Sequence, residues 1–261
     1  MGRSYGGIFR NWPGVRTRAR PAGTPGSRHC AAARTARSLG EASSSGGRIE
    51  SLSADLATEQ GLALVLRRLD ELREIELLIN NAGVATAGDF VAASPDHVMV
   101  EIRVNVEAVV QLTQHVLGPM VKRRGGAVIN VASVVGFQPF PHFAVYAATK
   151  AFVLSFTEAL AEELRGTGVR ILALCPGSAR TEIDVFAHNK GLLGKLPSLT
   201  AQQVVKTGLR ALKNGRVVKV VGGLNRFLPF VGRLMPRQTV RWLMGMSVKP
   251  GRSPVVERVN S

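Results

Sequence analysis

The sequence predicts an α/β protein with a doubly wound parallel sheet in a single domain. From about Arg48 onward, short apolar runs alternate with amphipathic segments, and turns that contain glycine or proline separate them. This alternation is typical of repeated β-α units, which build parallel sheets. The runs are almost continuously apolar, as expected for strands that helices cover on both faces. With 261 residues, the chain is long enough to bury one sizeable core.

Five apolar runs are the predicted strands, at residues 49–52, 76–80, 127–132, 169–174 and 217–221. Ser94 followed by Pro95 predicts the start of a long helix that continues to about Arg123, because proline is favoured in the first turn of a helix. Thr200 and Gln203 have the spacing of a capping box before another helix. A third helix is predicted by residues that recur every four positions and form one buried stripe, namely Phe152, Phe156, Leu160 and Leu164.

Charge and cysteine content narrow the function classes. The formal net charge is +16, and residues 1–50 contribute nine arginines against two acids. Elsewhere the signs are mixed, and no basic stripe is interleaved with aromatic residues, so we expect no nucleic-acid partner. There is no run of about 18 apolar residues, so we expect no transmembrane segment, and we expect no metal site. Two distant cysteines, Cys30 and Cys175, give no disulfide framework and predict a reducing compartment, the cytoplasm.

Tyr146 and Lys150 are the first candidates for chemistry. Residues four apart share one face of a helix, so the two side chains would lie one turn apart. An ammonium group beside a phenol favours the phenolate and lowers the tyrosine pKa from about 10 towards working pH, which makes tyrosine a usable acid or base. A pair on the surface of an ordinary helix has the same spacing, so the motif depends on its context.

Polar or small residues directly follow three of the predicted strands. Ser133 ends one strand, and ligands bind at the carboxyl ends of strands in open α/β sheets, so its hydroxyl could hydrogen-bond a substrate carbonyl beside the tyrosine. The other two strand ends carry Asn80-Asn81-Ala82-Gly83 and Cys175-Pro176-Gly177, the latter followed by Thr181. Small residues there would let the backbone approach a ligand closely. Each of these stretches could also be an ordinary turn.

Asn105 lies among valines in the long predicted helix. A polar side chain in apolar surroundings needs a partner, so it could hold a water molecule, fix the helix near the lysine, or be satisfied locally. Each of these five signals is modest when taken alone. Their common order, each at a strand end or in an adjoining helix, points to a single site.

Together, these stretches resemble the short-chain dehydrogenase/reductase family. The resemblance covers residues 48–225 and rests on NNAG at 80–83, RVNVEA around Asn105, NVAS ending at Ser133, YAATK from Tyr146 and PGSART from Pro176. It implies a Rossmann-like fold. It also implies hydride transfer between a nicotinamide cofactor and a carbonyl or alcohol substrate.

The resemblance implies roles for individual residues. Tyr146 would be the proton donor in reduction, Ser133 would orient the carbonyl, and Asn105 would anchor a proton-relay water. Lys150 would complete this catalytic tetrad by lowering the tyrosine pKa and holding the nicotinamide ribose. Asp55 would meet the adenine. The remaining cofactor contacts would be Asn81, Ala82, Gly83, Pro176, Gly177 and Thr181. Residues 183–199 would form the substrate lid, and pairing through the helices of Asn105 and Tyr146 would give a homodimer or homotetramer.

Residues 1–47 depart from the family. Its members begin with a strand and the turn Thr-Gly-x-x-x-Gly-x-Gly, which places the cofactor pyrophosphate on a helix N-terminus. This chain has no such turn, so we expect the first β-α-β unit to be missing or aberrant. With permitted codons, residues 5–13 read one nucleotide later become Thr-Gly-Ala-Ser-Ser-Gly-Ile-Gly-Arg, which is the missing motif. We therefore interpret this segment as out-of-frame translation, corrected by a second shift near residues 40–48. A targeting peptide is the alternative, but it would precede an intact motif rather than replace it.

The sequence thus predicts three regions: an aberrant or disordered segment at 1–47, a catalytic core at 48–225 and an amphipathic extension at 226–261. The predicted function is an NAD(P)-dependent oxidoreductase acting on a small-molecule carbonyl or alcohol, with NADP(H) preferred and NAD(H) possible. The tail, with Asn225, Phe227, Leu228 and Phe230, resembles that of family members acting on apolar or acyl substrates, and this resemblance implies such a substrate. One alternative is an extended-family epimerase or dehydratase, which shares Tyr-x-x-x-Lys but usually lacks NNAG. The other is a catalytically impaired binding protein of the same fold.

Overall fold

A computed structural model of the chain describes residues 8–9, 50–177, 199–223, 235–247 and 255–259. Several of the predictions above lie outside the described residues. They are the cofactor contact Thr181, almost all of the proposed lid, most of residues 1–47, and the tail residues Asn225, Phe227, Leu228 and Phe230.

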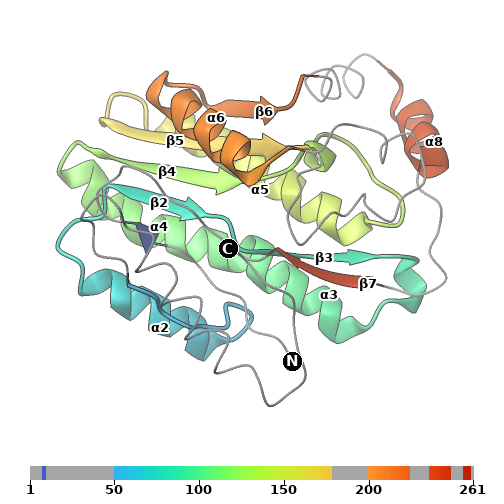
Figure 1. The fold of residues 1–261 in the computed structure, drawn as a ribbon, viewed down its shortest axis with the longest axis horizontal. Helices are drawn as coiled ribbons and strands as arrows, with labels where there is room; N and C mark the ends of the chain where they lie inside the picture. Colours follow the sequence, from blue (N-terminus) through green and yellow to red (C-terminus); the bar gives the residue numbers. More distant parts are fainter. Residues whose placement is uncertain (1–7, 10–49, 178–198, 224–234, 248–254, 260–261) are drawn as a thin grey trace.

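Four of the five predicted strands form a parallel sheet. They are β2 (Leu77–Asn80), β4 (Gly126–Val131), β5 (Val169–Pro176) and β6 (Val218–Val221), and they lie side by side in that order (Figure 1). The registers place Leu78 beside Val128 and Ile129 beside Leu172, so apolar residues meet across the sheet. The predicted α/β class with a parallel sheet is therefore confirmed.

The prediction of a strand at residues 49–52 is wrong for its described part, because residues 50–55 form no regular structure. A strand needs a neighbour for its backbone hydrogen bonds. Among the described residues, the free side of β2 is paired only by the two-residue strand β1 (Ile8–Phe9), which runs antiparallel to it with Ile8 opposite Leu78. No parallel partner is therefore available there for a strand at 50–52.

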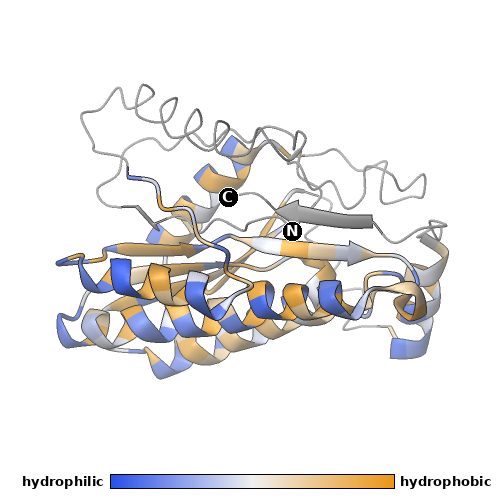
Figure 2. Cartoon of the chain, turned by 90° about the horizontal axis from the view of Figure 1, so that it is seen from below, coloured by the Kyte–Doolittle hydropathy of each residue, from blue (hydrophilic) through white to orange (hydrophobic). Residues whose placement is uncertain are grey.

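Helices cover both faces of the main sheet, as the doubly wound arrangement requires. One face packs against α2 (Glu59–Asp70), α4 (Ala108–Lys122) and α5 (Ala144–Glu163), and the other packs against α6 (Ala201–Lys213) (Figure 1). Neighbouring residues of β4 show the alternation: Val128 joins the core beneath α2 and α4, whereas Ile129 joins the core beneath α6. Figure 2 shows strands that are mostly apolar and helices that carry both polar and apolar residues.

The predicted long helix is present but is not uniform. It comprises α3 (Pro95–Ile102), a π-helical segment η2 (Arg103–Glu107) and α4, and it begins directly after Ser94, as expected. The capping box before α6 is confirmed, because Thr200 Oγ1 accepts from the Gln203 backbone and Gln203 Oε1 accepts from the Thr200 backbone. Each of these hydrogen bonds satisfies a donor that a helix start otherwise leaves without a partner.

The predicted buried stripe on α5 is only partly buried. Leu164 is 8% exposed, but Phe152 is 42% exposed and stacks on Phe156 with 5.7 Å between the ring centroids. The four residues therefore lie along one helix, as predicted, with Leu164 at its C-cap, but the end of the stripe at Phe152 is exposed rather than buried. That end of α5 borders a surface groove, which is described under Proposed function.

A two-stranded sheet and a further helix lie beyond the carboxyl edge of the main sheet. Strand β3 (Gly83–Ala87) leaves the main sheet directly after β2 and pairs antiparallel with β7 (Val255–Val259). Helix α8 (Arg237–Ser247) packs Val240 and Met244 into a small apolar core with Phe140, Phe143 and Tyr146. None of the helices in the described part of the chain is long and apolar enough to span a membrane.

Candidate active site

The predicted catalytic tyrosine and lysine lie together on α5. Tyr146 and Lys150 are 7% and 3% exposed, and the Lys150 Nζ lies 5.8 Å from the centre of the tyrosine ring. The same ammonium donates to the Val131 carbonyl oxygen over 2.8 Å, which fixes it to the last residue of β4. The helical spacing of the pair and one hydrogen bond thus place the lysine at the carboxyl edge of the sheet.

Burial changes the acidity of Lys150. Removal of the ammonium from water is the largest effect and lowers its pKa to about 8, while the charges of Cys175 and Glu101 act in the opposite direction. Below that pH the lysine is charged and attracts negative charge on the nearby phenol. A charged group is therefore held next to the ring of Tyr146.

Ser133 lies on the loop that joins β4 to α5. It is 8% exposed, and its Oγ accepts from the backbone N–H of Val135 over 3.4 Å, at the start of the short helix η3 (Val134–Phe137). In the same turn, Gly136 packs against the backbone of Lys150. A Cβ at Gly136 would come within 2.7 Å of the Lys150 carbonyl carbon, so only glycine allows this approach. The serine loop and the catalytic helix are therefore held in direct contact.

Asn105 occupies the centre of the π-helical segment and is fully buried. Its Oδ1 accepts from the Val84 backbone N–H over 2.8 Å, and its Nδ2 donates to the Val84 carbonyl over 2.8 Å and to Thr149 Oγ1 over 3.0 Å. π-helical turns are rare and occur frequently at functional sites. The asparagine thus connects β3 to the residue that precedes Lys150. Its expected role in anchoring a water stays a prediction.

A polar network beneath the site was not predicted. Asn80 is buried, and its Nδ2 donates to Thr113 Oγ1 over 2.9 Å and to Asn130 Oδ1 over 2.8 Å; Asn130 in turn donates to Thr157 Oγ1. This network joins β2 and β4 to the two helices behind them. The available signal was an asparagine inside the apolar run AVINVA, because a polar residue in a buried strand requires buried partners.

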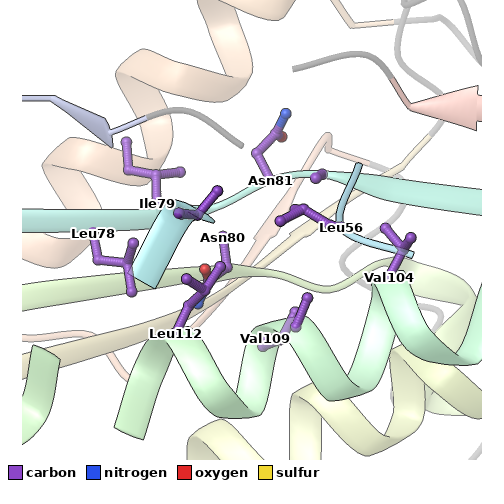
Figure 3. A pocket seen from close by; sticks show the side chains of 11 residues that line it. Leu56, Leu78, Ile79, Asn80, Asn81, Val104, Val109 and Leu112 are labelled. Carbon is purple, nitrogen blue, oxygen red and sulfur yellow. The ribbon is translucent and has the colours of Figure 1, made fainter. Parts of the chain in front are cut away.

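The residues after β2 are brought to the predicted edge. Ala82 is 8% exposed, Gly83 is buried and Asn81 is half-buried. Figure 3 shows the side chain of Asn80 pointing towards Leu112 and that of Asn81 pointing away from the small cavity of about 20 Å³ beside them. Of these two asparagines, Asn81 is the one whose amide is directed away from the interior.

Asp55 lies near this edge, since the adjacent Leu56 lines the same cavity as Asn81 and Ala82. Its carboxylate accepts from the Ala57 backbone N–H over 3.0 Å, and its carbonyl accepts from the Thr58 backbone N–H over 3.0 Å. These bonds form a local turn that leads into α2. A contact between Asp55 and adenine stays a prediction.

The end of β5 also reaches the site. Pro176 and Gly177 are both half-buried at the carboxyl edge, next to β4, the strand that precedes Ser133. The structure thus brings Asn105, Ser133, Tyr146 and Lys150 to one edge of the sheet, together with the described cofactor contacts. No group of three or more potential metal-ligating side chains occurs in the parts of the chain that the structure describes.

A nicotinamide cofactor fits this edge at one of its two ends. The Lys150 ammonium has three N–H donors, and the bond to Val131 uses one, which leaves donors to offer to ribose hydroxyls. The opposite end lacks its expected partner, since the described residues contain no Gly-x-x-x-Gly-x-Gly turn before a helix. The residues expected at the catalytic half of a cofactor site therefore lie together, and a pyrophosphate cradle is not found in the described residues.

The chain matches the sequence pattern of the family described as short chain dehydrogenase over residues 22–190, which is more than half of its length. The chain therefore belongs to the short-chain dehydrogenase family. The match begins earlier than residue 48, where the resemblance was expected to start, and leaves out residues 5–13.

Three known proteins illustrate the similarity. The ketoacyl reductase HetN of Nostoc sp. (strain PCC 7120) is 30% identical over 191 residues, which are 70% of this chain and 66% of that protein. A short-chain dehydrogenase from Sphingobium yanoikuyae, solved in complex with NADPH, is 31% identical with a TM-score of 0.67 over 81% of each chain. A 4-hydroxyisoleucine dehydrogenase, solved in complex with NADH, is 25% identical with a TM-score of 0.57 over 65% of this chain and 76% of that one. The chain spans between about half and two thirds of the length of the curated relatives that it matches.

Proposed function

We propose that this chain is an NAD(P)-dependent oxidoreductase that interconverts a carbonyl and an alcohol, with Tyr146 as the general acid or base. The observation that carries the proposal is the buried pair of Tyr146 and Lys150, with the lysine fixed on Val131 at the carboxyl edge of the sheet. A cofactor bound there would supply or accept the hydride. The family relationship supports the same reaction class.

Each residue of the tetrad has a task in the proposed reaction. The positive charge of Lys150 favours the phenolate form of Tyr146, so the phenol can give up or take back a proton at neutral pH. The Ser133 hydroxyl orients the substrate carbonyl towards that phenol. Asn105 holds β3 and Thr149 in place next to the lysine, and we propose that it also binds a relay water.

The substrate is proposed to be apolar or acyl. Tyr146 lies in an apolar cluster with Phe140 and Phe143, to which α8 adds Val240 and Met244, so one side of the tyrosine is lined by apolar side chains. A polar group of the substrate that lay against this apolar side would lose its hydration without a hydrogen bond in return. We propose NADP(H) as the preferred cofactor on the family resemblance, with NAD(H) as the alternative.

The chain is proposed to form a homodimer or homotetramer in the cytoplasm. A groove of about 450 Å³ lies between the helix of Asn105 and α5, and its lining includes Phe90, Ile102 and Phe152. These three side chains are 62%, 37% and 42% exposed, which is unusual for large apolar residues. A second copy that covers the groove would remove this surface from water.

A catalytically impaired binding protein is the second candidate. It is favoured by the irregular backbone at residues 50–55 and by the short antiparallel β1, because both lie where the pyrophosphate half of the site would be built. In this case the tetrad would be intact, but the cofactor would bind too weakly for turnover.

The experiment that tests the proposed function is a turnover assay of the purified chain with NADPH and NADH against apolar ketones, aldehydes and 3-oxoacyl thioesters. Tyr146→Phe keeps the ring and removes the acid, so the rate should fall by about 10²–10⁴-fold. Phe143→Tyr is a control in the same cluster. Its turnover rate should fall less than that of Tyr146→Phe, because the Tyr146 hydroxyl is kept. Equal rates for Tyr146→Phe and the unchanged chain would exclude Tyr146 as the acid.

A further inference from the structure

Glu101 is a buried acidic residue that the proposed mechanism leaves unused. It is 0% exposed in α3, and neither of its carboxylate oxygens has a hydrogen-bond partner among the described residues. Burying an unpaired carboxylate costs several kcal/mol of folding free energy, so such a group is either protonated or stabilised by a nearby positive charge. The sequence analysis did not identify it, because the pattern VEIRVN shows an acid in a helix but not which way it faces.

The position of Glu101 relates it to the active site. It lies four residues before Asn105, so the two side chains share one face of the helix. On the facing strand β3, Val84 and Thr86 also share a face, because they are two residues apart. Asn105 binds the backbone of Val84. Glu101, one helical turn before Asn105, lies opposite Thr86 on the same strand.

The contact between Glu101 and Thr86 is incomplete. The hydroxyl and backbone of Thr86 influence the carboxyl, yet no atom pair meets the geometry of a hydrogen bond, and Thr86 Oγ1 is itself buried without a partner. Three polar oxygens are thus buried in this region without a hydrogen-bond partner among the described residues. A protonated carboxyl is able to donate to the Thr86 hydroxyl, which an ionised one cannot do.

Glu101 and Lys150 influence each other electrostatically. Burial is the largest effect on the carboxyl and raises its pKa to about 7, whereas Thr86 and the charge of Lys150 lower it. In return, the charge of Glu101 raises the pKa of the Lys150 ammonium. Cys175 also acts on that ammonium, but burial raises the pKa of its thiol to about 12, so it is neutral at physiological pH.

Among the described residues, Lys150 is the charged group that acts on the Glu101 carboxyl. The remaining charged or titratable side chains of α3 and η2 are exposed, namely Asp96, His97, Arg103 and Glu107. On β3 the facing residue is Thr86, which does not titrate, and on α5 the facing charge is Lys150, which in turn faces Tyr146.

We propose that Glu101 is a positioning residue for the active site: its carboxyl, held opposite Thr86 one turn before Asn105, maintains the charge on Lys150. This assignment rests on the proposed function, because Lys150 matters through Tyr146. When Glu101 is ionised, it supports the protonated lysine and thereby the phenolate. When it is neutral, that support is lost.

The first test is the pH profile of turnover for Glu101→Gln, which keeps the size of the side chain and removes its charge. The alkaline limb, where Lys150 loses its proton, should move to lower pH by several tenths of a unit to about one unit, because an attractive charge is gone. Glu107→Gln is the matched control, since Glu107 is an exposed glutamate in the same continuous helix. An unmoved alkaline limb would mean that Glu101 is only structural and would overturn the proposal.

The second test needs no turnover and uses melting temperatures from pH 5 to pH 8. The unchanged chain should lose stability as pH rises through 7, because its folded state holds the Glu101 proton more tightly than the unfolded state does. The difference in melting temperature between Glu101→Gln and the unchanged chain should therefore increase with pH, and Glu107→Gln should show no such trend. A difference in melting temperature that does not change with pH would contradict a raised pKa for the Glu101 carboxyl.

A double-mutant cycle of Glu101→Gln and Lys150→Met separates the two proposals. At pH 7.5 the two changes should be non-additive in unfolding free energy, since each removes the partner of the other. Additive effects would refute the coupling even if the enzyme turns over. If the unchanged chain shows no turnover but the cycle is non-additive, the proposed function fails and the coupling of Glu101 to Lys150 stands.

Discussion

The two ends of the proposed cofactor site differ sharply. At the catalytic end, parallel strands β4 and β5 deliver Ser133 and Pro176 to one edge, and α5 adds Tyr146 and Lys150 with defined hydrogen bonds. At the other end, β2 is bordered by a two-residue antiparallel strand, and residues 50–55 are irregular. The residues of the proposed catalytic end and those of the expected pyrophosphate end therefore come from separate stretches of the sequence.

The sharpest way to test this difference is to restore the missing turn. Replacing residues 1–47 by the segment that the shifted reading frame encodes, with its Thr-Gly-Ala-Ser-Ser-Gly-Ile-Gly-Arg motif, should tighten NADPH binding by roughly 100-fold, because a helix N-terminus would then receive the pyrophosphate. Nicotinamide fluorescence titration measures the affinity. Tight binding by the unchanged chain would show that residues 1–47 already build a phosphate site.

The buried ammonium of Lys150, which the proposed reaction needs, should lower the stability of the folded chain. Lys150→Met removes a buried ammonium and should stabilise the chain by about 2 kcal/mol at pH 7, after allowing for the lost bond to Val131. The folded-state pKa of about 8 lies below the ordinary value of 10.5, so the unfolded state binds more protons between these pH values. The unchanged chain should therefore regain stability as pH rises from 8 to about 10.5.

Urea unfolding at pH 7 and pH 10 measures this effect. Lys122→Met, at the exposed end of α4, is the control and should change little at either pH. A Lys150→Met chain that is less stable than the unchanged chain at pH 7 would mean that the ammonium is a net stabilising group.

Two glycines test how tightly the catalytic end is packed. Gly136→Ala would place a methyl group 2.7 Å from the Lys150 backbone and should cost roughly 1–2 kcal/mol, with a loss of turnover as the lysine shifts. Gly118→Ala, in α4, meets no atom of another element within 4 Å but precedes Pro119, so its helix-propensity gain is offset and it should change stability by less than about 1 kcal/mol. Thermal unfolding of both variants decides the point, and a neutral Gly136→Ala would show that the loop has room to move.

Most of the sheet could be predicted because its strands carry their own signal. The apolar runs predicted as strands form β2, β4, β5 and β6; β4 and β5 are mostly buried on both faces, whereas β2 and β6 are partly buried. The run at residues 49–52 reads the same way, but its regular pairing depends on a neighbour that local sequence does not supply. Phe152 fits the helical period of α5 and is nevertheless exposed, because period predicts a face and not what covers it.

The part of the site that lies within one helix could be predicted, because helical spacing fixes which side chains are neighbours. Contacts between residues distant in the sequence could not be predicted in this way. Tyr146 and Lys150 are one turn apart in any helix. The burial of Glu101 and the link between Asn80 and Asn130 depend on elements that only the tertiary structure brings together. The π-helical segment around Asn105 also could not be foreseen, because its reason is the backbone of Val84 on another element.

The bond pair between Asn105 and Val84 has a consequence for engineering this fold. One side-chain amide offers the same donor and acceptor as a peptide unit, so it imitates a neighbouring strand for the backbone of β3. The chain can therefore turn away from the main sheet at Gly83 without leaving that peptide unsatisfied. Any replacement at Asn105 that lacks both an acceptor and a donor would change the route of the chain as well as the chemistry.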